Sequence, residues 1–172
     1  LKINQKSRTW IKQIGTSNYE VLYSLSQTSD GGYIVGGYTG LNGGDILILK
    51  LDSSGNILWT RQIGTSNDEY LRSLSQTSDG GYIVAVDRYT TNWDILILKL
   101  DSFGNILWTR QIGTSNNDRL YFLSQTSDGG YIVGGGVDTI LNRGDFLILK
   151  LDSFGNILWT RQIGTSNNEV LY

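Results

Sequence analysis

Apolar and polar residues alternate along short segments of this chain with a period near two. The segment 71–77 alternates apolar with small polar residues, which predicts a strand with two different faces. The segments 57–63 and 82–86 are rich in β-branched and aromatic residues, which also favour strands. Residues 46–49 are apolar at every position, as in a strand covered on both faces. No segment has the period of a helix, so the pattern predicts an all-β protein.

Short turn sequences separate the predicted strands. Asp79-Gly80-Gly81 is typical of a tight hairpin, because glycine accepts positive φ. The segment 101–105, Asp-Ser-Phe-Gly-Asn, predicts a second turn. One unit is therefore expected to hold four antiparallel strands, with a variable loop at 87–93 between its second hairpin strand and 94–100.

The unit recurs about every 50 residues, and Trp10, Trp59, Trp108 and Trp159 mark the repeat. The segment 27–35 returns unchanged at 76–84 and 125–133. A single sheet of this kind cannot bury its own faces, so the copies are expected to stack. Radial stacking of four-stranded sheets predicts a β-propeller, and a β-solenoid is the alternative. The strand around Leu74 carries hydroxyl side chains on one side, which predicts an innermost strand beside a wet channel.

The whole chain, 1–172, is predicted to be one propeller-repeat region. It divides into the end of a blade (1–14), three blades (15–63, 64–112 and 113–163) and the start of another (164–172). Three blades and two fragments are fewer than the usual ring of about four to eight. We therefore expect a longer protein around this segment, or copies of the chain joined through unpaired strand edges into a ring or filament. The absence of Met at position 1 fits a removed leader or a segment of a longer chain.

Composition narrows the chemistry. The chain is 39% hydrophobic and its net charge is −2, so a packed core is expected and a nucleic-acid partner is not. It contains no His and no Cys, which removes the usual zinc sites, thiol nucleophiles and Ser-His-Asp triads. No apolar run is long enough to predict a membrane span. We expect no metal, no cofactor and no catalytic residue.

Three recurring motifs carry a resemblance to a known family. They are Asp-Gly-Gly-Tyr-Ile-Val at 30–35, Asp45 through Asp52, and Gly55 through Trp59, each with its copies. Together they resemble the DGGYI-type propeller repeats of secreted and cell-surface proteins in bacteria and archaea, which share a layout with kelch repeats. The first repeat departs from the pattern at 4–8, where Asn-Gln-Lys-Ser-Arg replaces the usual turn. The resemblance implies a propeller fold and an extracellular or cell-surface setting, and it implies no established catalysis.

Candidate recognition residues lie where the copies differ. The segment 19–23 differs from 68–72 and 117–121, and the predicted loops 38–44, 87–93 and 137–144 also vary. Aromatic and charged side chains there suit a sugar face or a protein partner. The candidate binding residues are Tyr38, Arg88, Tyr89, Trp93, Asp138 and Arg143. Neutral drift in exposed loops is the alternative explanation.

Repeated motifs are expected to be structural. The Asp-Gly-Gly aspartates (Asp30, Asp79 and Asp128) suit hairpin turns better than calcium, which needs several converging oxygens. The Trp and Arg of the fourth strand are expected to form a cation–π pair within the sheet packing. The acidic residues Asp68, Glu69 and Asp118 suggest a glycan-acting enzyme only weakly, because adjacent strand residues point to opposite faces. We expect a non-catalytic extracellular scaffold, with a lectin-like carbohydrate-binding module as the alternative.

Overall fold

A computed structural model describes residues 13, 19–40, 44–64, 67–139 and 142–164, with only the backbone described at 138, 139, 142 and 143. Strands occupy most of this part of the chain, and no helix occurs in it. Accordingly, none of the described residues belongs to a helix that is long and apolar enough to cross a membrane. The prediction of an all-β protein is confirmed.

The strands form three separate four-stranded sheets, in which each strand pairs antiparallel with the next in the chain. The first sheet contains β1 (Glu20–Gln27), β2 (Tyr33–Thr39), β3 (Ile46–Leu51) and β4 (Ile57–Ile63). The second contains β5 (Asp68–Gln76), β6 (Tyr82–Tyr89), β7 (Trp93–Leu100) and β8 (Ile106–Ile112). The third contains β9 (Asp118–Gln125), β10 (Tyr131–Thr139), β11 (Asn142–Leu151) and β12 (Ile157–Ile163).

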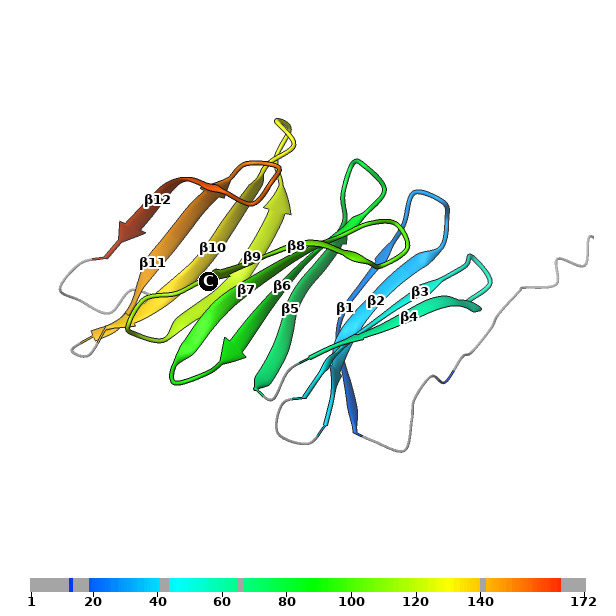
Figure 1. Cartoon of the computed structure of the whole chain (residues 1–172), viewed down its shortest axis with the longest axis horizontal. Helices are drawn as coiled ribbons and strands as arrows, with labels where there is room; N and C mark the ends of the chain where they lie inside the picture. The colour runs from blue at the N-terminus through cyan, green and yellow to red at the C-terminus, as the bar shows by residue number, and fades with distance from the viewer. Residues whose placement is uncertain (1–12, 14–18, 41–43, 65–66, 140–141, 165–172) are drawn as a thin grey trace, which may run out of the picture.

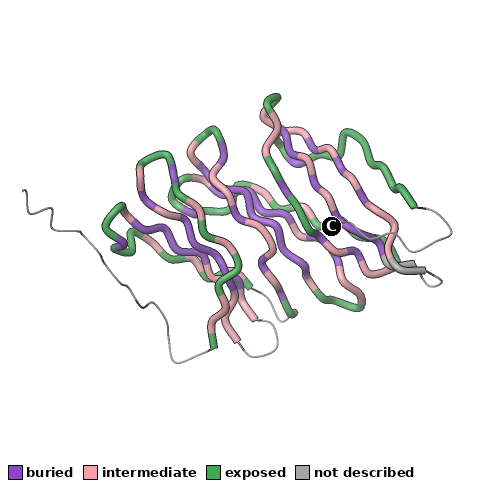
Figure 2. The backbone as a smooth tube through the Cα atoms, turned by 180° about the vertical axis from the view of Figure 1, so that it is seen from behind, coloured by how far each residue is buried: buried purple, intermediate pink, exposed green. Residues whose placement is uncertain are grey.

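The three sheets stand side by side in chain order (Figure 1). Two apolar layers separate them. Between the first and second sheets lie Ile34 and Ile48 on one side and Leu71, Leu74 and Val84 on the other. Between the second and third lie Ile83, Ile97, Leu120, Leu123 and Val133. Figure 2 shows the resulting gradient, with buried backbone through the middle of the stack and exposed backbone at the hairpin tips and along β12.

The prediction of cover on both faces was made for 46–49, and the copy of that run in the middle sheet shows such cover. Ile95 and Ile97 are fully buried against the third sheet, while Leu98 and Leu100 are buried against the first. Each first strand lies beside the first strand of the neighbouring sheet, and the Ser24 Oγ donates a hydrogen bond across this boundary to the Leu74 carbonyl at 3.1 Å. The first strands therefore occupy corresponding edges of successive sheets.

The strands extend beyond the ends predicted for them. The segment 87–93 was expected to be a loop, but β6 runs to Tyr89 and β7 begins at Trp93, so only three residues form the turn. Asp87 and Arg88 pair with Ile95 and Asp94 in the ladder. The charged side chains of Asp87 and Arg88 lowered the apparent strand propensity here, and cross-strand pairing overrode it.

Candidate functional site

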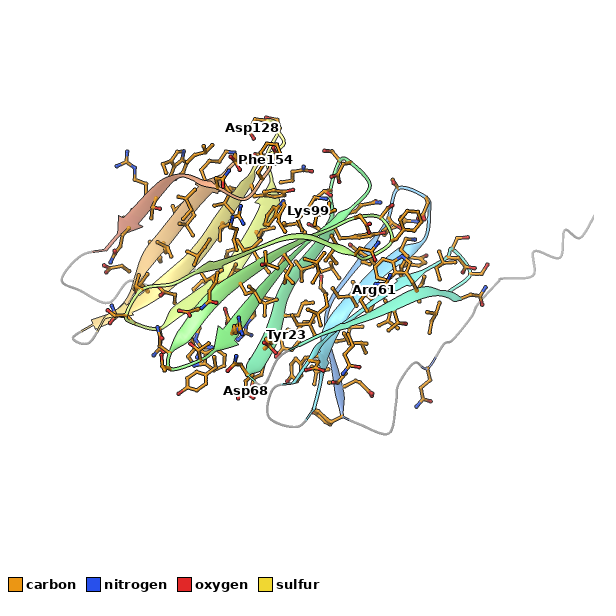
Figure 3. All side chains as sticks on the ribbon, in the orientation of Figure 1. Tyr23, Arg61, Asp68, Lys99, Asp128 and Phe154 are labelled. Atoms are coloured by element: carbon orange, nitrogen blue, oxygen red, sulfur yellow. The ribbon has the colours of Figure 1, made fainter. Side chains whose placement is uncertain are left out.

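The two ends of the stacked sheets are built differently. One end holds the turns that join first to second strands and third to fourth strands, and the other holds the turns between second and third strands (Figure 1). In Figure 3, Asp128 and Phe154 lie at the first end, while Tyr23 and Asp68 lie toward the second. We call them the turn end and the variable end.

At the turn end, each Asp-Gly-Gly turn is held by a lysine from the third strand. In the middle sheet the Asp79 carboxylate accepts the Gly81 N–H at 3.0 Å and pairs with the Lys99 ammonium at 2.9 Å. Lys99 is almost fully buried and also donates to the Leu100 carbonyl at 3.0 Å. Gly80 has φ of +81°, which explains the glycine at that position. Lys50 pairs with Asp30 and Lys150 with Asp128 in the same way.

These contacts hold the carboxylates in their charged form. Partial burial of Asp79 raises its pKa, but the hydrogen bonds from Lys99 and Thr77 outweigh burial and lower the pKa to about 2. The hydrogen bond from Lys50 is the largest of the effects that lower the pKa of Asp30. Each of these carboxylates is thus paired with an ammonium group of its own sheet. Among the described residues no group of three or more acidic side chains could hold a metal ion.

A second recurring feature of the turn end joins one sheet to the next. The Arg61 guanidinium on β4 donates to the carbonyls of Gly104 at 3.2 Å and Phe103 at 2.8 Å, in the turn between β7 and β8. The Trp59 indole N–H donates to the Ser102 carbonyl of the same turn at 3.3 Å. The Trp59 ring also contacts the Tyr82 ring, with centroids 5.7 Å apart. We call this arrangement the Trp–Arg clamp.

The arginine and ring contacts of the clamp recur between the second and third sheets. Arg110 donates to the carbonyls of Gly155 at 3.1 Å and Phe154 at 3.0 Å, and the Trp108 ring lies 5.9 Å from that of Tyr131. Each arginine also lies over its own tryptophan, as the sequence predicted. The shortest of these contacts go to backbone carbonyls, and each arginine also donates to the side chain of the turn's last asparagine, Asn105 at 3.4 Å and Asn156 at 3.3 Å.

The variable end holds a chain of aromatic rings that crosses from the first sheet into the second. Centroids of successive rings lie 5.6 Å apart for Tyr23–Tyr38, 5.1 Å for Tyr38–Tyr70, 5.4 Å for Tyr70–Trp93 and 5.1 Å for Trp93–Tyr89. Burial raises the pKa of the Tyr38 hydroxyl, which keeps it neutral. Such contacts are typical of offset and edge-to-face aromatic packing.

Two arginines and one buried carboxylate complete this group. Arg72 lies 5.8 Å from the Tyr23 and Tyr70 rings, and Arg119 lies 3.9 Å from the Trp93 ring. Asp87, only 1% exposed, pairs with Arg72 at 2.8 Å and with Arg119 at 3.6 Å. We call these eight residues the aromatic–arginine cluster: Tyr23, Tyr38, Tyr70, Arg72, Asp87, Tyr89, Trp93 and Arg119.

A β-bulge in each first strand helps to place the cluster. The ladder skips Tyr23 in β1, Arg72 in β5 and Tyr121 in β9, at the same position of each repeat. A bulge redirects the side chain of the extra residue and bends the strand. The repeats thus share a bulge, which carries tyrosine in the first and third sheets and arginine in the second. Sequence alone gave no signal for the bulge, because the surrounding letters are those of an ordinary strand.

The arginines and Asp87 line a recess between the second and third sheets. Its volume is about 430 Å³, and its other lining residues are Leu120, Tyr121 and Phe122. Asp87 also accepts the Leu120 N–H at 2.9 Å, which ties the floor of the recess to β9. The side chains of Arg72 and Arg119 remain 29% and 30% exposed. The recess therefore presents guanidinium donors beside exposed aromatic faces.

The structure brings three of the six predicted binding residues together. Tyr38, Tyr89 and Trp93 belong to the aromatic–arginine cluster. Arg88 instead lies 3.5 Å from the Glu69 carboxylate and contacts the Gln111 side chain. The side chains of Asp138 and Arg143 lie outside the described part of the structure. The other five cluster residues were not among the predicted binding residues, although all of them lie in segments that differ between the copies: Tyr23, Tyr70, Arg72, Asp87 and Arg119. The sequence could not single them out, because their proximity depends on how the strands and sheets pack.

The acidic residues that weakly suggested catalysis do not share one cleft. Asp68 is exposed, whereas Glu69 is buried beside Arg88. Asp118 is buried and accepts hydrogen bonds from the backbone N–H and the hydroxyl of Thr114. A glycosidase pair needs an acid and a base facing one substrate, and this arrangement does not supply it.

Comparison with known proteins adds no relative to these observations. No protein-family model matches the chain, and no curated protein matches it significantly. Function must therefore be inferred from the sheets and the cluster themselves.

Proposed function

We propose that the protein is a non-catalytic scaffold and interaction module, outside the cell or at its surface, whose sheets stack radially as blades of a β-propeller. The Trp–Arg clamp carries this proposal, since it joins each successive pair of sheets through the same contacts. Repeating one step between rigid units generates a ring, or a helical filament if the rotation does not close. The extracellular setting rests on the resemblance of the repeats to secreted propeller repeats.

Further contacts between sheets also recur with the repeat. The Ser29 N–H donates to the Gln76 side chain, and the Ser78 N–H to that of Gln125, both at 2.8 Å. Each glutamine ends a first strand, and each serine lies in the preceding Asp-Gly-Gly turn. The first strands are therefore drawn together at one edge of the stack, which favours a radial arrangement over a straight one.

Electron microscopy of the particle tests this proposal. We expect class averages in which sheets radiate from a central channel lined by first strands. A straight stack of sheets, as in a solenoid, would exclude the propeller. A closed particle containing a single chain of 172 residues would exclude the larger assembly.

A carbohydrate-binding function is a second candidate, favoured by the recess beside the aromatic–arginine cluster. Aromatic faces bind sugar rings, and the forked donors of arginine bind carboxylates. Asp87 offsets only one of the two arginine charges that line the recess. The ligand that fits best is thus a sugar that bears a carboxylate.

Titration with oligouronates and with neutral oligosaccharides of the same length tests this candidate. We expect Arg119→Gln and Tyr121→Ala each to weaken oligouronate binding about 10-fold or more, since each removes a contact of order 1.4 kcal/mol. Arg161→Gln, an exposed arginine on β12, is the matched control and should leave binding unchanged. Equal binding of neutral and acidic sugars would reject the role of charge, and binding of neither would reject the candidate.

A further inference from the structure

In the apolar layer between the first two sheets, two leucines of one sheet pack against a glycine of the other. Leu71 and Leu74 of β5 project onto Gly36 of β2, and both leucines are almost fully buried. A Cβ atom at Gly36 would lie only 2.7 Å from the Leu74 side chain. The two leucines therefore fill the space that a side chain at Gly36 would occupy. We call this space, over the small residue of the second strand, the seat.

The same packing of two leucines over a small residue recurs between the second and third sheets. Leu120 and Leu123 of β9 take the places of Leu71 and Leu74, and Ala85 takes the place of Gly36. Ala85 is fully buried there. Two leucines on a first strand thus pack over a small residue on the preceding second strand at both internal boundaries.

The outer face of the first sheet carries the leucines of this arrangement. Leu22 and Leu25 of β1 are the counterparts of Leu71 and Leu74, yet they are 61% and 59% exposed. They border an apolar hollow of about 260 Å³ whose lining includes Val35 and Leu49. Their exposure contrasts with the burial of the same residues in the two sheets that follow.

The outer face of the third sheet carries the seat. Gly134 is the counterpart of Gly36, and the only described atoms near the Cβ position belong to Phe122, at 3.8 Å. A hollow of about 600 Å³ lies over it and is lined in part by Ile132 and Ile148. Their counterparts Ile34 and Ile48 are fully buried at the first boundary.

We propose that a second copy of this chain docks face to face on the third sheet, with its Leu22 and Leu25 seated over Gly134. The inference rests on the proposed function, in which sheets stack by one repeated step. The second copy is the occupant because it presents the two leucines at the spacing that both internal boundaries already accept. The interface is heterologous, since one surface meets a different one, and each added copy presents the seat again.

Sedimentation of the full chain tests the interface. We expect the wild-type chain to associate with rising concentration, and Leu25→Arg and Gly134→Arg each to abolish association while retaining cooperative thermal unfolding. Leu107→Arg is one matched control, because Leu107 and its counterparts in the other two sheets are about equally exposed and lie in neither apolar layer. Gly134→Ala is the other, because the buried Ala85 occupies the same position at an internal boundary. Both controls should associate as the wild type does.

Mixing the two disabled variants gives the sharpest result. Leu25→Arg retains an intact third-sheet face and Gly134→Arg retains an intact first-sheet face, so together they should form a 1:1 complex of twice the chain mass and nothing larger. If the two variants do not form this complex, the proposed interface is wrong. Association of the wild type that neither variant disturbs would overturn it while leaving the scaffold function standing.

Two further outcomes separate the alternatives. A wild-type chain that stays monomeric at millimolar concentration would overturn both the interface and the proposed assembly. Leu171 lies outside the described residues and is the sequence counterpart of Leu22. If Leu171→Asp lowers the melting temperature and Leu25→Arg leaves the mass unchanged, the seat is filled from within the chain, and the proposal is wrong.

Discussion

The turn end and the variable end are built from the same strands, yet side-chain contacts recur from sheet to sheet at the turn end and differ at the variable end. At the turn end, the lysine–aspartate pair recurs within each sheet and the Trp–Arg clamp recurs at each boundary between sheets. At the variable end, one bulge position carries tyrosine, arginine and tyrosine in the three sheets. The difference teaches that contacts between sheets depend on repetition, whereas the aromatic–arginine cluster depends on departures from it.

The carboxylates that pair with cations follow the same division. The Asp-Gly-Gly aspartates pair with a lysine of their own sheet, so each turn is complete within one repeat. Asp87 occurs in the middle sheet alone among the described copies, and its arginines come from two different sheets. A change at the turn end should therefore affect stability most, and a change at the variable end should affect recognition most.

Removal of the clamp should give the largest effect. We expect Trp59→Ala to reduce the free energy of unfolding by about 3 kcal/mol, near the lower end for loss of a packed aromatic side chain. Trp159→Ala removes the same residue from the outer face of the third sheet, where it is 45% exposed, and should cost less than about 1 kcal/mol. Urea denaturation of both variants measures the difference, and equal costs would show that the clamp does not join the sheets.

Acid should weaken the turn end next. The pKa values of Asp30, Asp79 and Asp128 lie below the ordinary 3.8, so their contribution to stability is present above that pH and declines as pH falls below it. The contribution of Asp79 is lost as pH falls through about 2. For Asp79, whose carboxylate is partly exposed, we expect about 1–2 kcal/mol. Melting temperatures between pH 5 and about 2 measure the loss, which should be smaller in Asp79→Asn. An unchanged pH profile in that variant would contradict the role of the Lys99 pair.

A change in the aromatic–arginine cluster should have the smallest effect on stability. We expect Arg119→Gln to lose the contact with the Trp93 ring and to cost about 0.5–2 kcal/mol. Near-ultraviolet circular dichroism should report the altered surroundings of Trp93, while the melting temperature falls by only a few degrees. A loss as large as that of Trp59→Ala would make the cluster a structural joint and erase the contrast between the two ends.

Much of the fold could be predicted from the sequence because its signals are local. The Asp-Gly-Gly turns require positive φ at one glycine, and the apolar run at 46–49 requires cover on two faces. The prediction failed at 87–93, where strand pairing continues through charged residues. Asp87 reads as a loop residue in the sequence and is fully buried in the structure, because its partners Arg72 and Arg119 come from other strands. Contacts of that kind depend on the spacing between sheets, which local sequence does not encode.

Because the clamp joins only neighbouring sheets, it affects the order in which the sheets are expected to unfold. Arg61 and Arg110 each contact a turn about one repeat ahead, and the described contacts between sheets join immediate neighbours. Stability in such an array is approximately a sum over adjacent pairs. Within the described part of the chain the middle sheet has two neighbouring sheets and each outer sheet has one. Amide hydrogens of β6 and β7 should therefore exchange with solvent more slowly than those of β11 and β12. Unfolding is then expected to begin at the outer sheets and to reach the middle last.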